Sequence, residues 1–155
     1  MVGVFERAFT TPKVFRGEKH ATTRHLSEYS TLDFEMGFIK DHTDVMSMHE
    51  KVLRSIVTKI SEAEVQFPEK IPVMTIREVQ KTLGISEEEP DLEPEHERAI
   101  CEWALKEHGS DFVFVTHYPM SKRPFYTYED EDMPGYSKSF RSEERGVGQV
   151  GTARW

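Results

Sequence analysis

The sequence has little cysteine and no long apolar run. Cys101 is the single cysteine among its 155 residues, so no internal disulfide can form and a thiolate metal cluster is excluded. Cys101 lies between Ile100 and Trp103 in an expected helix, which indicates a buried small side chain rather than a reactive thiol. No apolar stretch approaches the ~20 residues that a membrane-spanning helix requires. The start, MVGVFERAFTTPK, has no basic stretch followed by an apolar one, so we expect no signal peptide and a cytoplasmic location.

The sequence also lacks the excess of positive charge that is usual in general nucleic-acid binders. Its formal net charge is −8, and the acids gather in SEEEPDLEPEHE (86–97) and YEDEDMP (128–134), which are typical of solvated surface. Positive charge is concentrated in the segment 13–25, whose ionisable residues other than histidine are Lys13, Arg16, Lys19 and Arg24 against one acid, Glu18. This segment is therefore the candidate for a local anion site.

Local patterns predict an α+β fold. The pattern indicates a short helical end over 3–9, strands over 13–18, 30–39, 111–119 and 123–129, and helices over 43–63, 75–84 and 93–109. The strand 111–119 is nearly all apolar and is expected to be central in a sheet. Strand pairs that alternate with helices predict a mixed, mainly antiparallel sheet flanked by helices.

The segments 13–18 and 30–39 are close in sequence and are expected to pair as antiparallel strands. Arg16 and Glu18 would then share one face of the first strand, and Asp33 and Glu35 one face of the second. A guanidinium suits phosphate because its planar fork donates two parallel hydrogen bonds and stays charged. A salt-bridged sheet face with a solvated loop is the alternative, and spacing alone favours it because charge-rich hairpins are common.

The stretch FRGEKHATTRHLSEYSTLDFEMGF (15–38) resembles motif 2 of class II aminoacyl-tRNA synthetases, in their aspartyl/asparaginyl branch. The pattern is Phe-Arg-x-Glu, then Thr-x-Arg-His-Leu-x-Glu, an aromatic residue, and a strand with Asp-x-Glu-Met. The segments GSDFVFVTHYP, RPFYT and PGYSKSF also resemble later core strands of archaeal-type aspartyl enzymes. The resemblance covers residues 1 to about 140 and implies a partial catalytic core, followed by a divergent tail over 141–155.

The resemblance implies a role for each of six residues. Arg16 would be catalytic and would grip the α-phosphate of ATP, Glu18 would accept from the adenine amino group, Arg24 and His25 would reach the γ-phosphate, Tyr29 would stack on adenine, and Asp33 would hold the substrate ammonium. The loop from Lys19 to Leu26 would also approach the acceptor end of tRNA. Magnesium is a further expectation of the family, whose members form homodimers.

The sequence departs from the family pattern after Phe140. Arg141 and Gly148 stand where the family places two metal-binding acids, so no metal ligands are expected among these residues. Motif 1, which forms the family's dimer interface, and the glycine-rich motif 3 are not found in the sequence. We therefore expect a truncated, inactive central part of a catalytic domain, with incompletely covered apolar strand residues such as Phe112 and Phe114.

The parent activity implied by the resemblance is ATP-dependent activation of aspartate or asparagine and its transfer to tRNA. Two alternatives stay open. One is an enzyme of the same fold that forms free asparagine without tRNA, and the other is a non-catalytic paralogue that acts as a binding module.

Overall fold

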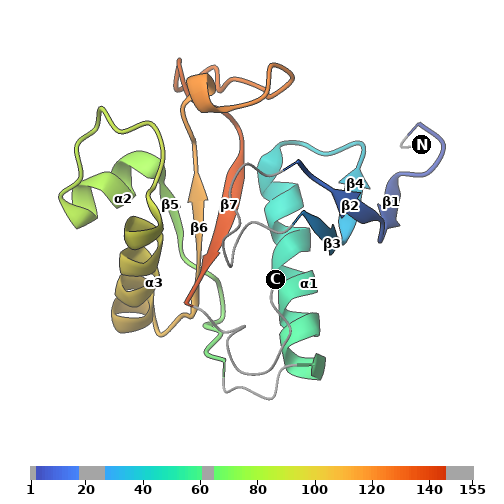
Figure 1. The fold of residues 1–155 in the computed structure, drawn as a ribbon, viewed down its shortest axis with the longest axis horizontal. Coiled ribbons are helices and arrows are strands. Elements are labelled where there is room, and N and C mark those ends of the chain that lie inside the picture. Colours follow the sequence, from blue (N-terminus) through green and yellow to red (C-terminus); the bar gives the residue numbers. More distant parts are fainter. Residues whose placement is uncertain (1–2, 18–26, 61–64, 146–155) are drawn as a thin grey trace. The chain divides into compact units, whose positions relative to one another are not determined.

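The computed structural model describes residues 3–17, 27–60 and 65–145. The chain divides into two compact units, Met1–Lys40 and Asp41–Trp155. Figure 1 shows strands alone in the first unit, and helices around a sheet in the second. In the described ranges, no helix is both long and apolar enough to cross a lipid bilayer.

Four short strands form the first unit. They are β1 (Arg7–Thr10), β2 (Lys13–Phe15), β3 (Glu28–Ser30) and β4 (Asp33–Met36). β1 pairs with β4 and β2 pairs with β3, both antiparallel, so the unit holds two two-stranded sheets. None of its described residues is buried, and several large apolar side chains are exposed, among them Phe5, Phe9, Phe15 and Phe38.

A three-stranded sheet is the centre of the second unit. β5 (Val73–Thr75) runs parallel to β6 (Phe112–Thr116), and β7 (Phe140–Glu144) runs antiparallel to β6 on its other side. All five residues of β6 are buried, which confirms the prediction that this apolar segment is a central strand.

Helices cover both faces of this sheet, as Figure 1 shows. One face packs on α2 (Ile76–Leu83) and α3 (Pro94–His108), and its cluster includes Val113, Val115 and the buried Cys101. Burial raises the pKa of the Cys101 thiol to about 12, which agrees with its interpretation as a buried apolar side chain. Phe112 and Phe114 point to the opposite face and pack against α1 (His42–Ile60). A single turn of 3₁₀ helix, η1 (Met120–Lys122), follows β6. The predicted α+β class is confirmed.

The ends of α2 follow directly from the sequence. The Thr75 hydroxyl accepts from the Glu78 N–H at 3.2 Å, and the Glu78 carboxylate accepts from the Thr75 N–H at 2.7 Å, which forms a capping box. Gly84 ends the helix with φ of +69°, a conformation that glycine adopts without steric cost. Both ends agree with the helix predicted over 75–84.

Three predictions about strands were wrong. Residues 7–10 form strand β1 instead of a helical end, because they pair with β4. Consequently β4 does not pair with the 13–18 segment, whose partner is β3. Residues 123–129 form turns instead of a strand, with the Thr127 N–H donating to the Pro124 carbonyl at 3.0 Å.

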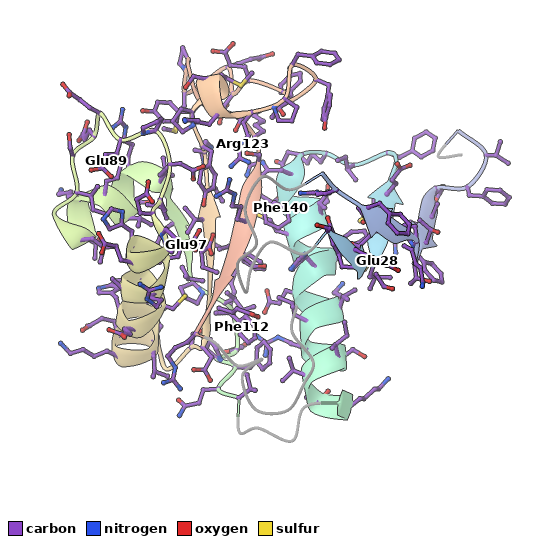
Figure 2. The ribbon with its side chains drawn as sticks, viewed as in Figure 1. Glu28, Glu89, Glu97, Phe112, Arg123 and Phe140 are labelled. Atoms are coloured by element: carbon purple, nitrogen blue, oxygen red, sulfur yellow. The ribbon has the colours of Figure 1, made fainter. Side chains whose placement is uncertain are left out.

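The expected exposure of Phe112 and Phe114 was also wrong. Each is 2 % exposed, because α1 and Phe140 cover the face of the sheet to which they point. Figure 2 labels Phe112 near the start of β6 and Phe140 at the start of β7.

Candidate functional site

Arg16 follows β2 directly, and the paired strands hold its backbone. Its N–H donates to the Ser27 carbonyl at 2.9 Å, and its guanidinium carbon lies 5.6 Å from the centroid of the Tyr29 ring. Tyr29 is half-buried in β3, whereas Arg16 is exposed. A guanidinium over an aromatic ring keeps its planar fork available at its edges. The two side chains therefore form one surface that offers a ring for stacking and charged donors for an anion.

Asp33 begins β4, opposite Thr10 of β1. Its carboxylate accepts a hydrogen bond from the Thr31 hydroxyl at 3.0 Å, and the residue is exposed. Asp33 and Tyr29 thus belong to different two-stranded sheets of the same unit, so the predicted sharing of one paired sheet by Arg16 and Asp33 was wrong.

The other three candidates of motif 2, Glu18, Arg24 and His25, lie outside the described residues. The described part of the site therefore consists of Arg16, Tyr29 and Asp33. Beside it, Lys13 and Glu28 form an exposed ion pair of 3.4 Å across β2 and β3, and Figure 2 labels Glu28 in this hairpin.

In the second unit, Arg141 stands at a position where the family resemblance places a metal-binding acid. It lies in β7 opposite Val115, and its two terminal nitrogens donate to the two Asp91 oxygens at 3.0 and 3.2 Å. A guanidinium that pairs with the neighbouring carboxylate does not fit a magnesium ion at this position. Among residues 3–17, 27–60 and 65–145 there is no cluster of three side chains that could hold a metal ion. Gly148, at the second acid position, is not described.

Two histidines, His42 and His117, lie close together where β6 ends, and the sequence pattern indicates this pair only weakly. His117 has a φ of +57°, its Nε2 lies 3.0 Å from an oxygen of the buried Asp130, and its Nδ1 lies 2.7 Å from the Thr116 hydroxyl. The ring of His42 meets that of His117 edge-on, with centroids 5.6 Å apart. Burial and then the nearby His117 lower the pKa of His42. The available signal was the histidine that directly follows an apolar strand.

Two further groups of aromatic side chains lie near these elements. Phe125 and Tyr126, in the segment predicted to be a strand, are 98 % and 76 % exposed because the segment forms turns. The ring of His49, in α1, packs edge-on against Phe114 and Phe140. Burial lowers the pKa of His49.

Known proteins resemble this chain over nearly its whole length. The model of the family "tRNA synthetases class II (D, K and N)" matches residues 1–149. The aspartate–tRNA(Asp/Asn) ligase of Deinococcus radiodurans is 41 % identical over 150 residues, which are 87 % of this chain and 34 % of the relative. The enzyme of the same name from Thermus thermophilus is 41 % identical over 161 residues, which are 95 % of this chain and 38 % of the relative.

Solved structures agree with this. The aspartyl-tRNA synthetase of Entamoeba histolytica matches 94 % of this chain and 34 % of its own, with a TM-score of 0.83 and 27 % identity. The Pyrococcus horikoshii asparaginyl-tRNA synthetase in complex with asparaginyl-adenylate shares the fold, with a TM-score of 0.73 at 21 % identity over 94 % of this chain and 36 % of its own. The chain spans about a third of the length of the curated relatives that it matches. It belongs to the class II aminoacyl-tRNA synthetases of the aspartate, lysine and asparagine group.

Proposed function

We propose that this chain carries the motif 2 half of an ATP site of an aspartate- or asparagine-tRNA ligase. The observation that supports this best is the stacking of Arg16 on Tyr29 within a hairpin whose sequence follows motif 2. Adenylate formation places additional negative charge on the α-phosphate, and a fixed cationic donor stabilises that charge in the transition state. Arg16 is the residue proposed for this role.

The remaining assignments extend the same proposal. Tyr29 supplies a ring for the adenine and Asp33 a carboxylate for the ammonium of aspartate or asparagine, while Glu18, Arg24 and His25 complete the adenine edge and the phosphates. The acceptor end of tRNA is the proposed partner of the 19–26 loop. A homodimer and a cytoplasmic location are proposed by analogy with the family, and so is the division into a core over 1–140 and a divergent tail. Magnesium has no step in this proposal, because a guanidinium occupies position 141.

One observation favours a second candidate, a non-catalytic paralogue that acts as a binding module. Arg141 replaces an acid of the family pattern, so position 141 offers no carboxylate to a metal ion, and its guanidinium pairs with Asp91. A binding module would retain ATP binding at motif 2 without forming an adenylate. An asparagine-forming enzyme without tRNA is proposed as the other alternative, and it would use the same residues.

The experiment is a titration of the full chain with ATP by calorimetry or ligand-observed NMR. We expect a dissociation constant on the order of millimolar, about −4 kcal/mol, because exposed ion pairs are screened by solvent. Arg16→Ala should remove most of this binding. Arg7→Ala, which removes the same charge from an exposed position on β1, should not. Micromolar binding that is insensitive to Arg16→Ala would show that the nucleotide binds elsewhere.

A further inference from the structure

A buried tyrosine in the second unit contacts two arginines. Tyr118 is fully buried, and its ring centroid lies 4.1 Å from the guanidinium carbon of Arg123 and 4.7 Å from that of Arg141. Within the part of the chain that the structure describes, the Tyr118 hydroxyl has no hydrogen-bond partner. Figure 2 shows Arg123 at the end of the sheet where β6 ends and β7 begins. Two like charges therefore share one aromatic ring.

The two guanidinium groups differ in how their charges are balanced. Arg141 donates two hydrogen bonds to Asp91, so its charge has a direct counter-ion. Among the described residues, Arg123 has no acceptor for its Nε or its Nη2, although both atoms are buried. Burial, and then the charge of Arg141, lower the pKa of Arg123. Buried N–H groups without an acceptor are rare in folded proteins and costly, and at a charged group more so.

Stacking on tyrosine does not by itself explain the unpaired donors. Arg77 lies 5.2 Å from the centroid of the Tyr136 ring, yet its Nη1 donates to the Glu87 carbonyl and to the Gln80 side chain, and it lies 3.4 Å from the Glu87 carboxylate. The same type of contact is thus made elsewhere in this unit with the donors of the arginine engaged. Arg77 is therefore a matched control for Arg123.

The unpaired atoms of Arg123 form one edge of its guanidinium. Nε and Nη2 point in parallel, and this edge accommodates two oxygens of a tetrahedral oxyanion. Because the donors have no accessible surface in this structure, the side chain has to rotate to receive a ligand. The segment that follows permits this, since Phe125 and Tyr126 are largely exposed and form turns. Asp91 also lies near Arg123, and Glu143 lies near Arg141 and Tyr118, so the site would hold an anion through the guanidinium edge of Arg123 and not through an excess of positive charge.

We propose that Arg123, supported by the Tyr118 ring and by Arg141, binds a phosphate-type oxyanion. This site lies wholly within the second unit and does not rest on the function proposed for the motif 2 hairpin. Its ligand is either a free anion, such as phosphate or pyrophosphate, or the phosphate group of an ester.

The test is NMR of the full chain labelled with ¹⁵N-arginine, in which the Nε–H signals are followed during titration. Pyrophosphate and inorganic phosphate represent the free anions, and ATP represents the ester. We expect a saturable shift of the Arg123 Nε–H signal with at least one of these, and the one that saturates at the lowest concentration identifies the source. The variants at position 123 lack this signal, so their binding is followed by the Nε–H signal of Arg141, which contacts the same tyrosine ring. Arg123→Gln should weaken binding about tenfold, and Arg123→Lys should weaken it less, because lysine keeps the charge but lacks the fork. Arg77→Ala should leave it unchanged.

Circular dichroism and thermal melting establish that each variant is folded before it is compared. The proposal is overturned if the Arg123 signal shows no saturable shift up to ~20 mM of any probe, a concentration well beyond the range of a charge-assisted site. It is also overturned if Arg77→Ala weakens binding as much as Arg123→Gln. Loss of ATP binding in Arg16→Ala, with pyrophosphate binding at Arg123 retained, would show that the two sites are independent.

Discussion

Arg141 replaces an acid of the family pattern, and its ion pair with Asp91 allows a quantitative test of how much this arginine contributes to the free energy of unfolding. The pair is bidentate, but the two side chains are 38 % and 34 % exposed, so solvent screens it. An exposed pair with this geometry is worth about 1 kcal/mol. The contact of Arg141 with Tyr118 contributes about 1 kcal/mol more. Arg141→Gln should therefore lower the free energy of unfolding by about 2 kcal/mol, and Asp91→Asn by about 1 kcal/mol.

A double-mutant cycle separates the pair from the stacking. If the two single losses were independent, the double variant Arg141→Gln with Asp91→Asn would lose about 3 kcal/mol of unfolding free energy. If the pair is worth about 1 kcal/mol, the double variant should lose about 2 kcal/mol instead, which is a coupling of about 1 kcal/mol. Urea unfolding followed by the fluorescence of Trp103, which is half-buried in α3, measures all four free energies. The coupling should shrink at high salt, because salt screens exposed charges. A coupling below ~0.3 kcal/mol would refute the reasoning, since the two side chains would then act independently.

Two further predictions concern the packing of the second unit. Asp111 is 1 % exposed and accepts hydrogen bonds from the Arg145 Nε at 2.8 Å and from the Gln66 N–H at 2.7 Å. Asp111→Asn should therefore lower the free energy of unfolding, measured by chemical denaturation, by about 2–3 kcal/mol. A loss below ~1 kcal/mol would contradict this. Burial lowers the pKa of His49 in the folded chain. As the pH falls below 6.5, the unfolded chain therefore takes up a proton at His49 that the folded chain does not. The free energy of unfolding should decrease from pH 7 to pH 5 by up to ~1.4 kcal/mol per pH unit. His49→Gln should reduce this slope in melts recorded at several pH values, and an unchanged slope in this variant would assign the effect to other groups.

The helices of this chain could be predicted from the sequence because their signals are local. The spacing of the apolar residues predicts α1. Thr75 and Gly84 mark the two ends of α2, and a continuous apolar run predicts β6. Each of these signals depends on residues within about one or two turns of the element itself. The same reasoning identified motif 2, since its residues lie within one stretch of chain.

Strand pairing could not be predicted in the same way, because it joins residues that are distant in sequence. The pairing of β4 with β1 joins residues at least 23 positions apart throughout the register, and the alternation of apolar residues does not specify which partner is chosen. The sequence predicts a strand over 123–129, yet Pro124 begins a turn and leaves Phe125 exposed. The coverage of Phe112 by α1 is likewise a tertiary contact with no local signature.

The arrangement of the first unit bears directly on how tightly its hairpin can bind a nucleotide. Its described residues include none that is buried, and a two-stranded pair without a buried face is marginally stable in water. Binding of ATP would then have to fix Arg16 and Tyr29 in their stacked arrangement, and part of the interaction free energy would be spent on that ordering. At the anion site proposed for Arg123, Tyr118 is fully buried and Arg141 is paired with Asp91, so only the Arg123 side chain has to reorient. Ordering one side chain costs less conformational entropy than ordering a hairpin. The second unit is therefore expected to bind a simple phosphate with less loss of conformational entropy than the hairpin, although the hairpin carries the sequence motif of the family.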